Sequence, residues 1–129
     1  MTRPAGGGLE ASLATEAHFQ LGKLARDDGD LAAAEKHYLT AIELKPTAPG
    51  AHVMLGVTLR DAGRVEEALA RYTDGLRLQP AIPAAQFNRA QCLMSLGRAS
   101  EAVAGFKTAI SLDPTFAVAY TALGDELTS

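Results

Sequence analysis

The chain has 129 residues and a formal net charge of −3 at pH 7, and 47% of its residues are hydrophobic although only 5% are aromatic. A core with so few aromatic residues must be built mainly from alanine and leucine, which favours closely packed helices over a sandwich of β-branched strands. Surfaces that bind nucleic acid are basic, so the acidic balance argues against nucleic acid as a partner. The same balance offers no polybasic segment for a membrane surface.

The first eight residues, MTRPAGGG, are expected to form a flexible tail (residues 1–8), because three successive glycines leave the backbone with high conformational entropy. No apolar run of the length of a signal peptide or a transmembrane helix follows them. The single cysteine, Cys92, cannot form an internal disulfide, which is compatible with a reducing compartment. Together these features predict a cytoplasmic protein.

An apolar stripe begins directly after the tail. Its members follow one another at steps of four, four, four and three residues: Leu9, Leu13, Ala17, Leu21 and Leu24. This spacing places all of them on one face of a helix. We therefore expect the first helix to begin before the repeated part of the chain does.

A period of 34 residues organises the rest of the chain, and it is clearest in Pro46, Pro80 and Pro114. Further columns keep the same step: Gly29, Gly63 and Gly97; Ala34, Ala68 and Ala102; Leu44, Leu78 and Leu112; Tyr38, Tyr72 and Phe106. Agreement of so many columns at one period is the signature of a repeat architecture.

Each column has a physical role. The glycine lies near the middle of each unit, where a left-handed residue ends one helix and the chain turns into the next. The proline follows the second helix and stops it, because proline cannot continue the hydrogen-bond ladder. A column of small residues lets neighbouring helix backbones approach closely: Gly22, Gly56, Ala90 and Gly124. The pattern therefore predicts a helix–turn–helix unit.

This 34-residue unit resembles the tetratricopeptide repeat family. The resemblance places repeats at residues 15–48, 49–82 and 83–116 and a lone helix at 117–128, within a domain of residues 9–129. It implies an all-α fold, a right-handed solenoid (superhelix) of antiparallel helix pairs whose first helices line a concave groove. The chain departs from the family where His18, His52, Gln86 and Tyr120 occupy a column that often holds tryptophan, and where Arg89 interrupts a column of leucines.

The resemblance also implies a binding surface, because the first helices carry a second face directed at the groove. The expected groove residues are Phe19, Gln20, Lys23, Val53, Met54, Val57, Arg60, Phe87, Asn88, Gln91 and Met94. Apolar members would receive side chains of a peptide, and the amides of Asn88 and Gln91 would hold its backbone. Family members that clamp an acidic chaperone tail carry other residue types at the matching positions, so an apolar or amphipathic peptide is expected instead.

The sequence offers little for catalysis. His18 and His52 are one period apart, but two ligands do not complete a zinc site. Cys92 is expected to be a core thiol, and no nucleophile elbow or phosphate loop is present. We therefore predict no enzymatic activity, no metal and no cofactor.

The last helix ends the chain without a second helix to pack on it. Its apolar residues form an expected self-association edge, Tyr120, Leu123 and Leu127. Three explanations stay open: the chain is part of a longer protein, the edge stacks on another copy to form a homo-oligomer, or the helix is a tolerated cap.

Two functions follow. The first is a non-catalytic scaffold that binds a peptide or helix of another protein in its largely apolar groove. The alternative is a segment that presents substrates or partners to a larger enzyme such as a glycosyltransferase.

Overall fold

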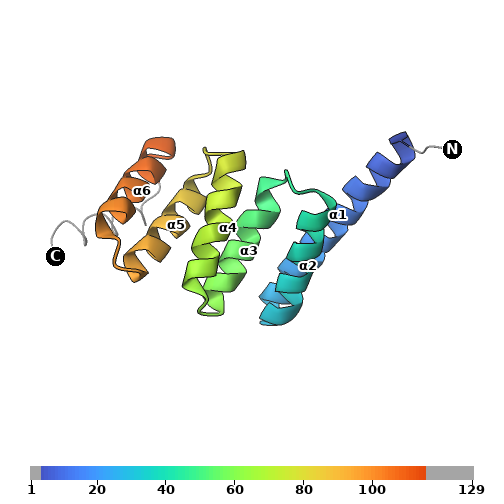
Figure 1. Cartoon of the computed structure of the whole chain (residues 1–129), viewed down its shortest axis with the longest axis horizontal. Coiled ribbons are helices and arrows are strands. Elements are labelled where there is room, and N and C mark those ends of the chain that lie inside the picture. Colours follow the sequence, from blue (N-terminus) through green and yellow to red (C-terminus); the bar gives the residue numbers. More distant parts are fainter. Residues whose placement is uncertain (1–3, 116–129) are drawn as a thin grey trace.

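The computed structural model describes residues 4–115, which form a row of helices without strands (Figure 1). In chain order the described helices are α1 (Pro4–Asp27), α2 (Leu31–Leu44), α3 (Pro49–Asp61), α4 (Val65–Leu78), α5 (Pro83–Ser95) and α6 (Ala99–Leu112). Each odd-numbered helix packs mainly against the even-numbered helix that follows it, and α2 and α4 then contact α3 and α5. The predicted all-α solenoid of helix pairs is confirmed.

The turn inside each pair is built around a glycine in the left-handed region. At the middle turn, Gly63 has φ 82°. Its N–H donates to the carbonyl of Arg60 at 2.9 Å, and the N–H of Arg64 donates to the carbonyl of Leu59 at 2.8 Å. These two bonds satisfy carbonyls that the end of α3 leaves unpaired. Gly29 and Gly97 make the same pair of bonds in their turns, so the predicted role of this column is confirmed.

Proline separates one pair from the next. Helices α2, α4 and α6 end at Leu44, Leu78 and Leu112, two residues before the prolines of the 34-residue period. Helices α3 and α5 then begin on a second proline each, Pro49 and Pro83. Proline suits the first turn of a helix because its missing N–H would have had no intrahelical partner there. The chain therefore starts each new pair at an equivalent point.

The core of each pair is an aromatic ring held against a small residue. The rings of Tyr38, Tyr72 and Phe106 are fully buried. A Cβ added to Gly56 would lie 2.9 Å from the ring of Tyr72. This distance is too short for a real contact, so glycine is what lets α3 approach α4 this closely. The first pair repeats the arrangement with Gly22 and Tyr38.

The third pair makes the same close approach with the residues exchanged. Its first helix carries Ala90 where the others carry glycine, and its second helix carries Gly105. A Cβ on Gly105 would lie 2.9 Å from the Cβ of Ala90. In the third pair the glycine is therefore on the second helix instead of the first. The 34-residue period does not predict this exchange, because Gly105 and Gly56 belong to different columns of the repeat.

The ends of the chain differ from the interior. Helix α1 begins at Pro4 and so includes part of the predicted tail, while the predicted helix at 117–128 lies outside the described residues. The leucines of the stripe on α1 are exposed rather than buried. No helix in the described part of the chain is long and apolar enough to cross a membrane. The predicted place in the cytoplasm stays a prediction.

The close approach of α3 and α4 predicts the effect of one methyl group. Gly56→Ala should lower the free energy of unfolding by about 1–3 kcal/mol, the usual cost of overpacking, because the new Cβ would overlap the ring of Tyr72. Gly50→Ala in the same helix is the matched control, since its Cβ would meet Phe19 only at an ordinary 3.5 Å. Urea unfolding followed by circular dichroism measures both. Equal stability of the two variants would contradict the packing described.

Burial of the only cysteine predicts its reactivity. Cys92 is 1% exposed, and burial raises the pKa of its thiol, so both access and the thiolate fraction are low. We expect alkylation in the folded protein to be slower than in urea by about a hundredfold or more, because local opening must precede it. Mass spectrometry of iodoacetamide-treated protein at pH 8 measures the rates. Rapid labelling of all molecules without denaturant would contradict a core thiol.

Candidate functional site

The residues predicted for the groove fall into three classes of accessibility. Gln20, Lys23 and Met94 are exposed; Phe19, Val53, Met54, Arg60, Asn88 and Gln91 are half-buried; Val57 and Phe87 are buried. They come from α1, α3 and α5, the first helices of the three pairs. The accessible members are therefore available to a ligand, whereas the buried ones act through packing.

An apolar row crosses from α1 to α3. Phe19, Val53 and Met54 are partly buried and pack against the core formed by the first two pairs. The ring of Phe19 meets the ring of Tyr38 edge-on, with centroids 5.9 Å apart. A small pocket opens beside Phe19 and is lined by Thr15, Glu16, Phe19, Ala48, Gly50 and Ala51. One side of each of these side chains is thus held by the core, and the other side is accessible.

Two predicted groove residues belong to the core instead. Val57 is 9% exposed and Phe87 is 6% exposed. Phe87 packs on Phe106 with ring centroids 5.4 Å apart. Both side chains are covered, although Phe19 and Val53, the repeat equivalents of Phe87, are only half-buried. A partner could not reach Val57 or Phe87 without displacing the packing.

A polar network joins the carboxyl-terminal ends of the first helices. Arg60 on α3 donates to the side-chain carbonyl oxygens of Gln91 at 2.7 Å and Asn88 at 3.3 Å on α5. On the other side Arg26 of α1 forms an ion pair with Asp61 of α3 at 3.0 Å. Each such contact is worth about 1 kcal/mol or less at a surface, so its main effect is on side-chain geometry. The predicted amide wall thus holds Arg60 in the free protein.

Two cationic side chains of the groove have no carboxylate partner among the described residues. Arg60 is held only by amides, as described above. The ammonium of Lys23 lies 5.7 Å from the centroid of the Phe19 ring, a distance that permits a cation–π contact. Both charges therefore border the apolar row and are free to pair with an acidic group of a ligand.

The histidines have structural partners. The Nδ1 atoms of His18 and His37 lie 3.1 Å apart, across α1 and α2. His52 Nε2–H donates to the carbonyl of Pro46 at 2.9 Å, and one period later Gln86 donates to the carbonyl of Pro80 at 3.0 Å. His52 and Gln86 thus tie the start of their helices to the preceding turn. Residues 4–115 contain no group of three or more His, Cys, Asp or Glu that could hold a metal ion.

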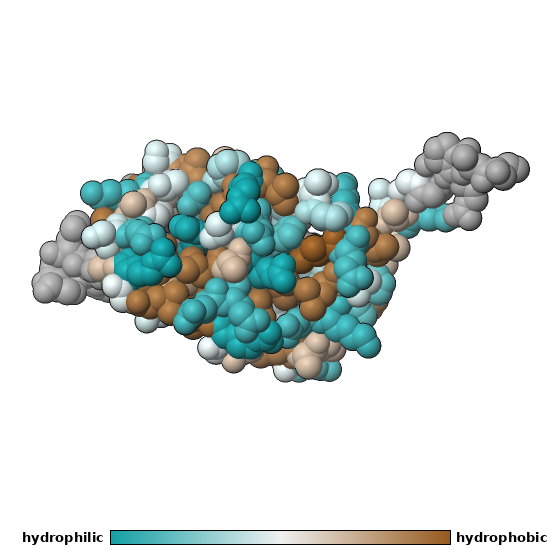
Figure 2. Space-filling model, in the orientation of Figure 1, coloured by the Kyte–Doolittle hydropathy of each residue, from teal (hydrophilic) through white to brown (hydrophobic). Residues whose placement is uncertain are grey.

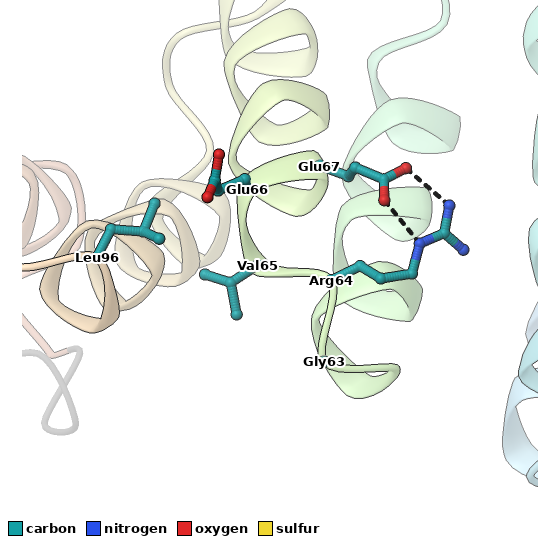
Figure 3. Close-up of a pocket in the computed structure, with 6 residues that line it drawn as sticks. All are labelled: Gly63, Arg64, Val65, Glu66, Glu67 and Leu96. Carbon is teal, nitrogen blue, oxygen red and sulfur yellow. Dashed lines mark hydrogen bonds and ion pairs between the residues drawn. The ribbon is translucent and has the colours of Figure 1, made fainter.

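A second depression lies at the turn between α3 and α4 and is shown in Figure 3. Its volume is about 350 Å³, and it is lined by Gly63, Arg64, Val65, Glu66, Glu67 and Leu96. Arg64 donates to both carboxylate oxygens of Glu67, at 2.8 and 2.7 Å, and to Glu35 at 2.7 Å. These hydrogen bonds lower the pKa of Glu67 and raise that of Arg64. Arg64 and Glu67 in the wall of the depression are therefore already paired with each other.

Arg98 and Glu101 repeat the Arg64–Glu67 contact at the next turn, with nitrogen–oxygen distances of 3.0 and 2.8 Å. The contact is therefore a feature of the repeat rather than of one site.

The structure shows how the charged side chain of Arg89 is accommodated in a column that otherwise holds leucine. Its side chain is half-buried, and its Nε–H donates to the hydroxyl of Thr73 at 2.9 Å. The guanidinium therefore reaches a polar partner at the edge of the core, as a long side chain with an apolar stem can.

The predicted self-association edge of Tyr120, Leu123 and Leu127 lies outside the described residues.

Known structures share this fold at low sequence identity. The first TPR of Spaghetti (RPAP3) bound to an HSP90 peptide matches with a TM-score of 0.87 and 15% identity, over 91% of this chain and 95% of that chain. The Yersinia enterocolitica type III secretion chaperone SycD in complex with a peptide of the translocator YopD matches with a TM-score of 0.78 and 23% identity, over 88% of each chain. No curated protein sequence matches this chain.

Two longer proteins also contain the fold. MamA protein matches with a TM-score of 0.82 and 22% identity over 88% of this chain, which spans 62% of the MamA chain. A Thermobaculum terrenum O-GlcNAc transferase mutant matches with a TM-score of 0.85 and 20% identity over 98% of this chain, which spans 23% of the transferase chain. At these identities the likeness shows the fold alone.

The sequence itself carries the assignment to a family. The tetratricopeptide repeat pattern matches residues 15–48, which include the second half of α1 and all of α2. It also matches residues 53–115, which include most of α3 and all of α4, α5 and α6. Together these ranges cover most of the chain and include part or all of each of the six described helices. The chain belongs to the tetratricopeptide repeat family.

Proposed function

We propose that the chain is a non-catalytic scaffold that binds a peptide or helix of a partner protein across α1, α3 and α5. The observation that carries this proposal is the half-buried apolar row of Phe19, Val53 and Met54, bordered by the unpaired charges of Lys23 and Arg60. A row held from below by the core loses little conformational entropy when a ligand covers it. Recognition of an amphipathic segment suits this arrangement.

The charged side chains beside the apolar row indicate which type of peptide would bind. Apolar side chains of the ligand would lie on Phe19 and Met54, and methionine adapts to more than one shape. An acidic residue beside them would pair with Lys23 or Arg60. If Arg60 turns to such a carboxylate, it releases the amides of Asn88 and Gln91, which can then hydrogen-bond the peptide backbone. The preferred ligand is therefore an apolar peptide with at least one acidic residue.

The similar structures support a peptide ligand. RPAP3 and SycD were each solved with a peptide of another protein, and each shares the fold of this chain over most of its length. Their low identity does not transfer those particular peptides to this groove.

An alternative role is the presentation of partners or substrates to a catalytic domain of a larger protein. The observation that favours it is the match to an O-GlcNAc transferase, of whose chain this one spans only 23%. The groove would then bind the substrate protein while the chemistry takes place elsewhere. The same surface serves both roles, so experiments on the groove test the part that they share.

One substitution in the apolar row tests the groove. Met54→Glu should weaken binding of peptides selected by the wild-type chain from a random 12-residue phage library by about tenfold or more, because it places a charge where apolar side chains dock. The melting temperature should fall only slightly, since Met54 is half-buried, whereas a glutamate at Val57 would place a charge in the core and lower it strongly. Leu78→Glu, on the exposed end of α4, is the matched control. Selected peptides that bind Met54→Glu as tightly as the wild type would show that they dock elsewhere.

A second substitution tests the predicted acidic preference. Arg60→Gln should leave selection of apolar residues intact and should weaken peptides that carry an acidic residue by about tenfold, the usual effect of losing one charged hydrogen bond. Isothermal titration of paired peptides, one with Glu and one with Gln at the acidic position, measures this difference. If both peptides lose affinity equally, Arg60 does not select the carboxylate.

A further inference from the structure

The amino-terminal helix is unlike the other first helices in length. Helix α1 has 24 residues, whereas α3 and α5 have 13 each. Figure 1 shows its amino-terminal half projecting past α2 at the end of the row. Most helical stability in water comes from packing against other elements, and a projecting helix has little of it. The extension therefore needs a partner more than any other part of the described chain does.

The outer face of α1 is a continuous apolar stripe. Leu9 is 62% exposed, Leu13 63%, Leu21 44% and Leu24 60%, and Ala17 between them is also exposed. Large apolar side chains gathered in this way mark an interaction surface more often than chance exposure does. On the face drawn in Figure 2, by contrast, apolar side chains lie in small groups between polar ones.

The positions equivalent to Ala17 and Leu21 are buried in the second pair. Ala51 and Leu55 on α3 correspond to Ala17 and Leu21, and they are 2% and 1% exposed. Helix α2 packs against α3, and α4 packs against α5 in the same way. No helix of the described chain covers the matching face of α1. The stripe therefore corresponds to a helix–helix interface, and the helix that would cover it must come from outside residues 4–115.

A preceding repeat is a poor candidate for that helix. Between pairs the chain leaves the helix around Pro46 and Pro80, and the equivalent position in α1 is Ser12. Helix α1 runs unbroken through Ser12. Leu9 and Leu13 thus extend the stripe into a region where a repeat would have a turn. The partner must be a long straight helix rather than the second helix of a repeat.

The stripe is complementary to itself. Leu13 and Leu21 each lie four residues from Ala17, while Leu9 lies eight residues before it and Leu24 seven after it. A two-fold axis through Ala17 would therefore place Leu13 against the partner's Leu21, and Leu9 beside the partner's Leu24. The small side chain at the axis lets the two helices approach closely. Such isologous contacts are the commonest way in which identical chains associate.

We infer that the stripe on α1 is a homodimer interface in which two copies of α1 pair antiparallel about Ala17. A contact of one helix per copy is small compared with the roughly 1,200–2,000 Å² of a standard interface, so the dimer should dissociate on dilution. Its face lies apart from Phe19, Val53 and Met54, so it leaves the groove free and does not depend on the proposed function. The predicted edge of Tyr120, Leu123 and Leu127 is a separate surface.

Sedimentation velocity of the 129-residue chain, from about 1 µM to about 500 µM, tests the inference in the range where small interfaces dissociate. The wild type should shift from monomer to dimer with rising concentration, and Leu13→Glu should stay monomeric. Leu78→Glu, at a leucine with 43% exposure on α4, should dimerise like the wild type. Circular dichroism should show that Leu13→Glu stays folded, because Leu13 is largely exposed.

Cross-linking tests the register. Ala17→Cys should form a disulfide-linked dimer on mild oxidation, because the axis brings the two Cβ atoms together, whereas Ser12→Cys on the same helix should not. The native Cys92 is buried and does not compete. A strict monomer at every concentration, or a dimer that survives Leu13→Glu, would overturn the interface. A dimer lost through Leu123→Asp, or one that Ala17→Cys fails to cross-link, would overturn the antiparallel pairing of α1.

Discussion

The close approach of the two helices in each pair, which a glycine permits, is the constraint on which the solenoid depends. In the second pair the ring of Tyr72 lies where a Cβ on Gly56 would overlap it, so the two backbones lie as close as the ring permits. The third pair reaches the same approach with Ala90 on one helix and Gly105 on the other. Successive pairs then stack in the same order, with α2 against α3 and α4 against α5.

The candidate groove is a consequence of this alignment. Each first helix uses one side for its own pair and another for its neighbours, and only what remains is open to a ligand. Phe19 and Met54 are half-buried and partly open. Val57, one turn after Met54, and Phe87, the repeat equivalent of Phe19 on α5, are buried instead. The bonds of Arg60 to Asn88 and Gln91 then connect α3 to α5. The open surface is thus narrow, with an apolar row on one side and a hydrogen-bonded polar network on the other.

The end of a solenoid poses a different problem, because stacking stops there and one helix loses its neighbour. Helix α1 does not replace the missing neighbour with polar residues. Its stripe keeps Leu21 in the column that Leu55 occupies inside the core, and it continues with Leu9 and Leu13 beyond the repeat. A helix with such a face gains most by pairing with a like helix, and its near-symmetry about Ala17 makes a second copy the best match among the described helices.

The sequence by itself determined the architecture of this protein. A period of 34 residues, a glycine at each turn and a proline after each pair set the helix boundaries, because these residues act through local backbone geometry, which neighbours barely alter. Its family resemblance also indicated the first helices as the site of a groove, and the groove stays a prediction. Only the tertiary structure decided which members of a column are accessible: Leu21 is exposed and Leu55 is buried, although both hold the same place in the repeat. It likewise decided that Asn88 and Gln91 bind Arg60, since periodicity specifies the face of a helix, whereas burial and hydrogen bonding depend on which other helix lies opposite.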